Sequence, residues 1–309
     1  MRRHLPHMPI PADARGAAIA LGNFDGVHAG HQAVIASARA TAQARGVALG
    51  VVVFEPHPRR FFQRDAPPFR LQNPPQRART LGVLGVSEVF EIAFDAALTQ
   101  MRDDRFADEV IKQRIGAVHV SVGDGFRFGR GRGGDAGSLM RLGGELGFSV
   151  DVVRPVEFEG ARISSSAIRA AICAGDMPAA NTLLGRPWAI EGEVRRGFAR
   201  GREFGFPTAN LNLGDYIRPR LGIYAVRVDI GDGRQMPGVA SIGINPTVGA
   251  LPEPVLEAHL FDFEGDLYGR LIEVELIAFL RDEAKFEDIA ALKRQMAEDA
   301  HNARAALMR

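Results

Sequence analysis

The chain has 309 residues, of which 46% are hydrophobic and 24% charged, and its formal net charge is +1. This length exceeds the size at which one hydrophobic core stops growing, so two domains are expected. The near-neutral charge gives no overall support for binding nucleic acid, and the longest apolar run is too short to span a membrane. A single cysteine, Cys173, excludes an internal disulfide framework, and no apolar secretion segment follows the basic N-terminus. Both features are typical of a cytoplasmic protein.

Short β-branched runs alternate with helical patterns in the first half of the chain. The expected strands are residues 17–21, 49–54, 87–94, 117–123 and 149–153. Helical patterns follow them, the first with Val34, Ile35, Ala38 and Ala42 on one face and Gly46 at its end, the others near 76–84, 99–115 and 136–147. This alternation predicts a doubly wound α/β fold with a parallel sheet, in which ligands bind at the carboxyl ends of the strands.

The character of the sequence changes after residue 184. Strand-like runs separated by Gly, Pro, Asn and Asp turns begin near residues 190, 223, 236, 256 and 271, and one helical pattern over 286–307 closes the chain. This pattern predicts an all-β barrel or sandwich with a C-terminal helix. We therefore expect one domain over residues 1–184 and a second over 185–309.

The segment GNFDGVHAGHQ, residues 22–32, lies between the first strand and the first helix and carries two histidines, His28 and His31. The free N–H groups and the dipole of a helix N-terminus attract anions, and imidazoles there add further donors. A zinc site needs three or four ligands, and the segment has no cysteine and no third histidine. Phosphate binding is therefore favoured over metal binding, and a purely structural role remains an alternative.

A second anion-binding pattern occurs at residues 160–169, GARISSSAIR. Three hydroxyls, from Ser164, Ser165 and Ser166, come at a helix start with Arg169 one turn inside. Hydroxyls, amide N–H groups and a guanidinium together bind phosphate oxygens, although an ordinary N-cap would explain one of the serines. Both segments follow strands of the α/β half, so they could converge on one triphosphate.

Two glycine-rich segments also carry arginines. Residues 122–135 contain a GxGxxG match, but it falls late in the sheet, so a basic loop closing over phosphates and a solvated loop are both better explanations than a dinucleotide fingerprint. None of the three lysines follows a glycine, which excludes a Walker A loop.

In the second half, GFARGREFGFPTAN (197–210) ends in Thr208 and Asn210, whose neutral oxygens suit magnesium held by ATP. Glu257 could take a proton from a substrate hydroxyl.

Taken together, these segments resemble the bacterial bifunctional riboflavin kinase/FAD synthetase family over nearly the whole chain. The adenylyltransferase module is matched in order by GNFDGVHAGHQ, FEPHP, GFRFGRGRGGD and ISSSAIR. The kinase module is matched in order by GREFGFPTAN, GIYAV, SIGINPT, LEAHLFDFEGDLYG and FLRDEAKF.

The resemblance implies an HxGH nucleotidyltransferase-like N-terminal module that joins FMN and ATP into FAD and pyrophosphate, and a riboflavin-kinase-like barrel that phosphorylates the ribityl 5′-hydroxyl. ATP, riboflavin and FMN are the implied partners, with Mg²⁺ arriving on ATP. His28 and His31 would stabilise charge as the FMN phosphate attacks the α-phosphorus, and Glu257 would be the base of the kinase.

Further site residues are implied in the same way. Nucleotide contacts are expected in the first module from Gly22, Asn23, Asp25, Gly30, Ser164, Ser165, Ser166 and Arg169, and in the second from Gly197, Gly201 and Arg202. Thr208 and Asn210 would ligate magnesium. The flavin contacts expected are Phe54, His57, Gly125 and Arg281.

Three positions depart from the family pattern: Gly125 replaces an acidic or amide residue, Val248 a phenylalanine and Arg196 a histidine. None is a residue assigned to the chemistry, so both activities are expected. Two alternatives are another HxGH adenylyltransferase, acting on a nicotinamide or pantetheine phosphate, and a flavin-binding or regulatory protein whose catalysis has decayed. The kinase half argues against the first, and intact His28, His31, Asn210 and Glu257 argue against the second.

Overall fold

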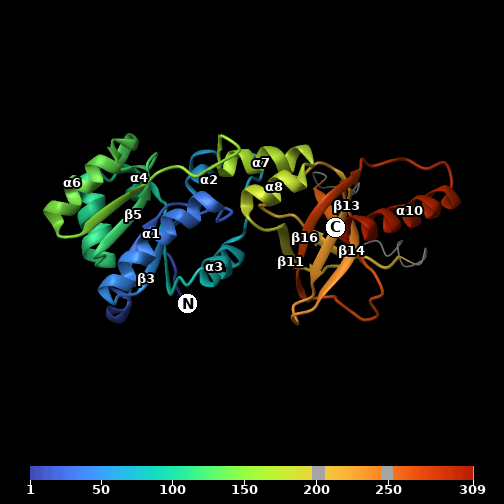
Figure 1. Ribbon diagram of the computed structural model, residues 1–309, viewed down its shortest axis with the longest axis horizontal. Coiled ribbons are helices and arrows are strands. Elements are labelled where there is room, and N and C mark those ends of the chain that lie inside the picture. The colour runs from blue at the N-terminus through green and yellow to red at the C-terminus, as the bar shows by residue number, and fades with distance from the viewer. Residues whose placement is uncertain (197–205, 245–252, 309) are drawn as a thin grey trace. The chain divides into compact units, whose positions relative to one another are not determined.

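A computed structural model describes residues 1–196, 206–244 and 253–308 (Figure 1). The chain forms two compact units, each described by itself below. Unit 1 contains Met1–Ala66 and Pro74–Ser164, and unit 2 contains Pro67–Asn73 and Ser165–Arg309. Two segments that precede residue 185, residues 67–73 and 165–184, therefore lie in the second compact unit.

Unit 1 is built on a six-stranded, fully parallel sheet with the order β1-β4-β3-β2-β5-β8. The strands are β1 Arg2–His4, β2 Ala18–Leu21, β3 Leu49–Glu55, β4 Glu88–Ala93, β5 His119–Gly123 and β8 Ser149–Val153. Five of them match the expected strands, and β1 was not expected. The strand order reverses at β2, which has β3 on one side and β5 on the other, so the loop after β2 lies at the topological switch point.

The helices of unit 1 alternate with these strands, as a doubly wound fold requires. They are α1 Ala29–Arg45, α2 Pro58–Phe62, α3 Pro74–Val83, α4 Ala96–Gln100, α5 Asp103–Arg105, η2 Phe106–Ile115 and α6 Ala136–Leu146. The short elements are η1 Ala12–Ala14, η3 Arg130–Arg132, β6 Arg127–Phe128, β7 Gly134–Asp135, β9 Glu157–Phe158 and β10 Ala161–Arg162. The expected apolar face of α1 is buried, and the helix ends at Gly46 with φ 64°.

The helix expected near residues 99–115 forms over most of that range, but it is interrupted at residues 101 and 102. The chain there forms α4, an extended residue at Met101 with ψ 127°, then α5 and the π-helical η2. The Met101 carbonyl accepts a hydrogen bond from the Arg130 N–H at 2.8 Å. A Cβ on Gly129 would lie 2.8 Å from the Asp103 nitrogen. The break therefore accommodates the glycine-rich loop, a long-range contact that the local pattern does not show.

Unit 2 contains a six-stranded antiparallel sheet with the order β11-β16-β13-β14-β15-β12. Its strands are β11 Trp188–Glu193, β12 Ala209–Asn212, β13 Gly222–Asp229, β14 Gln235–Ile244, β15 Pro254–Leu260 and β16 Leu271–Arg281. Just beyond β11, the Arg195 N–H donates to the Asn210 carbonyl at 2.9 Å, in an isolated antiparallel bridge to β12. This bridge joins the two ends of the sheet, so the fold is a barrel rather than a sandwich.

Helices cover this barrel, and they are α7 Ser165–Ala174, α8 Met177–Leu184 and α10 Ile289–Leu307. The C-terminal α10 packs against β13, β14 and β16, as Figure 1 shows. Segment 67–73 is tied into the same unit, because the buried indole of Trp188 donates to the Leu71 carbonyl at 2.8 Å. Among the helices of the described residues, none is long and apolar enough to cross a membrane.

Candidate active sites

The loop between β2 and α1 has an unusual backbone. Phe24 has φ 51°, Gly26 has φ 89° and Val27 has φ 44°. A β-branched residue such as valine is strained at positive φ, and strain of this kind persists only where the surroundings enforce it. Burial does so here, because Phe24 is 1% exposed and Val27 is fully buried. The core of unit 1 therefore fixes the loop that carries the two histidines.

His28 and His31 form a stacked pair at the start of α1. Their ring centroids lie 3.7 Å apart with planes 19° from parallel. His28 is the N-cap, and its Nδ1 accepts from the His31 backbone N–H at 3.4 Å. Because Nδ1 accepts, the neutral ring carries its proton on Nε2, where it can be donated to an anion. A Cβ on Gly30 would lie 3.2 Å from the His28 ring, so glycine gives this ring its space.

A cavity of about 740 Å³ opens at the carboxyl ends of β2, β3, β4 and β5. Five predicted site residues line it together, namely Gly22, Asn23, Phe54, His57 and Gly125. They come from the end of β3 and from loops that follow the strands, up to 103 positions apart in the sequence, as Gly22 and Gly125 illustrate. Pockets of this volume suit ligands as large as a mononucleotide or a drug molecule.

Aromatic rings form much of the lining of this cavity: Phe54, Phe62, Phe94, Phe106, Phe126 and Phe128. The Phe94 ring is edge-on to Phe54 at 5.9 Å and to Phe62 at 5.7 Å, while Phe126 and Phe128 stack at 5.6 Å. Aromatic faces and edges attract a planar ring system through offset stacking and T-shaped contacts. The cavity therefore suits a large planar ligand, and of its rings only Phe54 was predicted.

Arg77 is a buried residue to which no sequence pattern points. Its guanidinium, 2% exposed, lies 2.7 Å from the Glu55 carboxylate at the end of β3 and donates to the Asn23 carbonyl at 3.3 Å. Arg77 on α3 thus links the end of β3 to the histidine loop. Nothing in the periodicity of α3 distinguishes it from the neighbouring Arg79, so only the partner residues reveal it.

The serine motif lies where the two compact units divide. Ser164 ends unit 1, whereas Ser165, Ser166 and Arg169 belong to α7 in unit 2. Within unit 1, the Ile163 carbonyl lies 3.7 Å from the position a Gly30 Cβ would take, so the chain before Ser164 runs beside the start of α1. Within unit 2, Arg169 donates to the Phe69 carbonyl at 2.7 Å. Convergence of the serines and histidines on one triphosphate stays a prediction, as does the nucleotide role of Asp25, which is 3% exposed.

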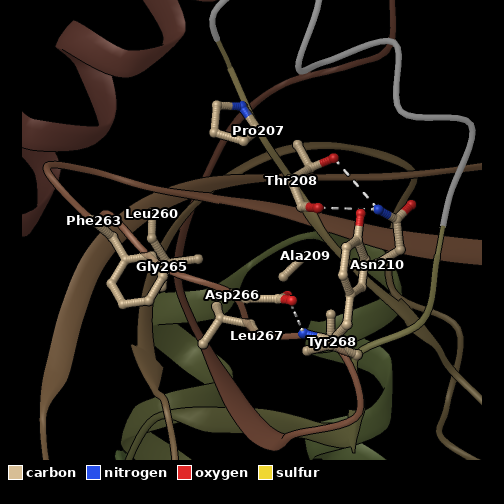
Figure 2. Close-up of a pocket in the computed structure, with 11 residues that line it drawn as sticks. Pro207, Thr208, Ala209, Asn210, Leu260, Phe263, Gly265, Asp266, Leu267 and Tyr268 are labelled. Carbon is tan, nitrogen blue, oxygen red and sulfur yellow. Dashed lines mark hydrogen bonds between the residues drawn. The ribbon is translucent and has the colours of Figure 1, made fainter.

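In unit 2, Thr208, Asn210 and Glu257 lie on neighbouring strands. Asn210 on β12 is the register partner of Glu257 on β15, so the two side chains leave the same face of the sheet. The Asn210 amide donates to the Thr208 carbonyl at 3.2 Å and to its hydroxyl at 3.4 Å (Figure 2). The amide NH₂ is thereby committed to Thr208, and the Asn210 Oδ1 points away from Thr208 (Figure 2). Neutral oxygens from a threonine and an asparagine suit Mg²⁺ that is already bound to phosphates.

Thr208 lines two cavities at once. The first, of about 70 Å³, also includes Asn210, Asp266 and Tyr268 (Figure 2). The second, of about 210 Å³, includes Glu257 and Arg281. The two cavities therefore adjoin at Thr208. Glu257 lines the second of them.

Arg281, predicted to contact flavin, is held in place at the second cavity. Its guanidinium makes two hydrogen bonds to the Asp299 carboxylate of α10, at 2.7 and 2.6 Å. Arg196, one of the departures, has its guanidinium 5.4 Å from the Tyr268 ring centroid, beside the smaller cavity. Four residues named in the sequence analysis, Gly197, Gly201, Arg202 and Val248, lie outside the described residues.

Unit 1 has a switch-point cavity beside a histidine pair at a helix N-terminus, and unit 2 has hydroxyl, amide and carboxylate groups between two cavities. Both arrangements serve the transfer of phosphorus-containing groups, so the fold and the sites define a transferase with two separate centres. The family model for FAD synthetase matches residues 10–167, and that for riboflavin kinase matches residues 184–307. The chain belongs to the family of bifunctional riboflavin kinase/FMN adenylyltransferases.

Relatives that carry this family name match the chain over nearly its full length. The relative from Pseudomonas fluorescens is 43% identical and covers 94% of this chain and 93% of its own. The relative from Escherichia coli K12 is 39% identical, with 96% and 95% covered. A crystal structure described as a macrolide-efflux protein from Streptococcus pneumoniae has a TM-score of 0.85 at 31% identity, covering 97% of this chain and 99% of that chain. The same two-unit architecture therefore occurs in a solved structure.

Proposed function

We propose that unit 1 joins FMN to the adenylyl group of ATP at the switch-point cavity. The observation that supports this best is the cavity itself, where aromatic rings suited to an isoalloxazine adjoin the loop that presents His28 and His31. An oxygen of the FMN phosphate attacks the α-phosphorus of ATP, the bond to the β-phosphate oxygen breaks, and pyrophosphate leaves. The imidazole N–H groups and the start of α1 stabilise the negative charge that develops, which is the main contribution proteins make to this kind of reaction.

In unit 2, riboflavin occupies the larger cavity and the phosphates of ATP the smaller one. Glu257 takes the proton of the ribityl 5′-hydroxyl as that oxygen attacks the γ-phosphorus, and ADP leaves. Thr208 and Asn210 would hold the magnesium ion that enters with ATP and that offsets phosphate charge. The direct pairing of Asn210 with Glu257 supports this assignment, because the two side chains leave the same face of the sheet beside each other.

Residues 1–184 then carry the adenylyltransferase chemistry and residues 185–309 the kinase chemistry, although residues 67–73 and 165–184 pack in unit 2. The location is the cytoplasm, where a free thiol such as Cys173 is stable and ATP is available. Gly22, Asn23, Asp25, Gly30 and the serine motif contact the nucleotide of unit 1, as the resemblance implies, and Phe54, His57 and Gly125 contact its flavin.

The proposal is tested by incubating the purified protein with riboflavin, ATP and magnesium and separating the flavins over time. FMN is expected to accumulate first and FAD to follow, with pyrophosphate released in equal amount to FAD. Conversion of FMN to FAD without any conversion of riboflavin would contradict the kinase assignment, and the reverse pattern would contradict the adenylyltransferase assignment.

A further inference from the structure

The charged side chains that line the unit 1 cavity are all arginines. Three of the residues that line it are arginines, Arg59, Arg127 and Arg132, and the lining includes no carboxylate. Cations and aromatic rings in the same lining complement a ligand that combines a planar ring with an anionic group. FMN is such a ligand, whereas riboflavin has the ring and ribityl chain without the phosphate.

Two of the three arginines already have side-chain partners. Arg127 lies 3.1 Å from the Asp135 carboxylate, and Arg59 donates to Gln63 at 3.2 Å. Within the part of the chain that the structure describes, Arg132 has no hydrogen bond or ion pair through its guanidinium. An exposed guanidinium at a cavity wall can bind a phosphate with two parallel hydrogen bonds, at a small desolvation penalty.

The backbone at Arg132 also points to a functional side chain. Its φ of 61° lies in the left-handed region, between Gly131 at 62° and Gly133, in a loop of which most residues are glycine. Glycine is the residue that adopts this conformation without strain, so arginine at this position is disfavoured by the backbone. The loop is nonetheless fixed, because the Arg132 N–H donates to the Gly129 carbonyl at 3.0 Å and the Arg130 N–H to Met101 at 2.8 Å.

Discrimination between FMN and riboflavin cannot come from the rings, because the two flavins share them. It has to come from a group that recognises the phosphate. We propose that Arg132 binds the phosphate of FMN and makes the unit 1 cavity select FMN over riboflavin. This inference rests on the proposed function of unit 1, and it matters in a chain whose other unit consumes riboflavin, because riboflavin would otherwise occupy the adenylyltransferase site.

The test compares Arg132→Gly with wild type in FAD synthesis from FMN at saturating ATP. The KM for FMN is expected to rise about 10- to 100-fold, the range for losing a hydrogen bond to a charged group. Lumiflavin, which has the ring without ribityl chain or phosphate, serves as a competitive inhibitor, and its Ki is expected to stay unchanged. Glycine accepts the left-handed backbone, so the melting temperature is expected to stay equal or rise. Arg132→Lys should restore part of the FMN affinity.

Arg130→Gly is the matched control, because it removes a cation from the same loop at a position that does not line the cavity. It is expected to leave the KM for FMN unchanged. An unchanged KM in Arg132→Gly, or a lumiflavin Ki that rises as much as that KM, would overturn the proposal.

Phe62→Ala distinguishes a wrong role for Arg132 from a wrong assignment of the flavin site. Phe62 lines the cavity and is 68% exposed, so its removal spares the core. If Phe62→Ala raises the lumiflavin Ki while Arg132→Gly changes nothing, the cavity holds flavin and only the role of Arg132 is wrong. If neither variant changes either constant, the cavity is not the flavin site of unit 1.

Discussion

Asn210 and Glu257 face each other directly across the β12–β15 pair. This register puts an amide and a carboxylate on one face of the barrel, although 46 residues separate them in the chain. Since the pairing belongs entirely to unit 2, the chemistry of the two units should be separable by single substitutions.

Glu257→Gln is expected to lower FMN formation from riboflavin by about 10²–10⁴-fold, the usual contribution of a general base. Glutamine keeps the size of the side chain and cannot accept the hydroxyl proton. The rate of FAD formation from supplied FMN serves as the internal control and is expected to remain at the wild-type level. A parallel loss of both reactions in a folded variant would mean that the two centres are not independent.

His31→Ala is expected to have the opposite effect. Loss of one preorganised donor to a developing charge reduces rates by about 10²–10³-fold, and this loss should fall on FAD synthesis alone. FMN production from riboflavin, measured in the same preparation, is expected to be unaffected. His31 contacts His28 through both ring stacking and the backbone hydrogen bond, so a circular dichroism spectrum identical to wild type should accompany the assay. A near-wild-type rate of FAD synthesis would remove His31 from the mechanism.

Arg77→Met tests whether α3 positions the histidine loop. The change breaks the ion pair with Glu55, which is 13% exposed at its side chain, and breaking a buried pair destabilises a protein by about 3–5 kcal/mol. The double variant Arg77→Met with Glu55→Gln removes the charge and should recover much of that stability. It still lacks the hydrogen bond to the Asn23 carbonyl, so kcat for FAD synthesis should stay low while riboflavin phosphorylation is normal. Full recovery of kcat in the double variant would show that Arg77 stabilises the fold without positioning the loop.

Acidification is expected to destabilise unit 1 through His119. Its Nδ1 lies 2.8 Å from the Ser149 hydroxyl and its Nε2 2.9 Å from the Ser121 hydroxyl, beneath α1. Burial lowers the pKa of His119 below its usual 6.5, and Arg45 adds to this, while Asp151 opposes it. The unfolded chain therefore binds this proton at a higher pH than the folded chain does. Stability is complete above about pH 6.5 and falls as the pH drops toward the lowered pKa.

Urea unfolding of the wild type and of His119→Asn, followed by circular dichroism at pH 7.5 and 5.5, measures this effect. The variant is expected to be less stable at pH 7.5 because it disturbs the serine network, yet to lose less stability between the two pH values. An equal loss in both proteins would assign the acid sensitivity to other groups.

The sequence was sufficient to predict the elements whose signals are local. The parallel strands of unit 1 are continuous apolar runs, and the end of α1 at Gly46 follows from a glycine in the left-handed conformation. The positions of His28 and of the cavity residues at the carboxyl ends of strands followed from that order of elements. The barrel strands were likewise visible as alternating runs between turns.

Features that depend on distant partners were not predictable in the same way. Arg77 resembles any surface arginine until Glu55 and Asn23 are seen beside it. The break at Met101 depends on a loop almost 30 residues later, through the Arg130 N–H. Strand β12 was read only as the end of a phosphate-binding segment, because its pairing with β15 is long-range.

Segment 67–73 belongs to the second compact unit although it lies early in the chain. Arg70 accepts from the Ile217 N–H at 2.8 Å and donates through its own N–H to Asp215 at 3.0 Å, while Leu71 accepts from Trp188. A stretch encoded within the first third of the gene is therefore a structural part of the kinase barrel. A chain that begins at residue 185 lacks this piece, so its barrel is expected to be less stable than the barrel of the full chain.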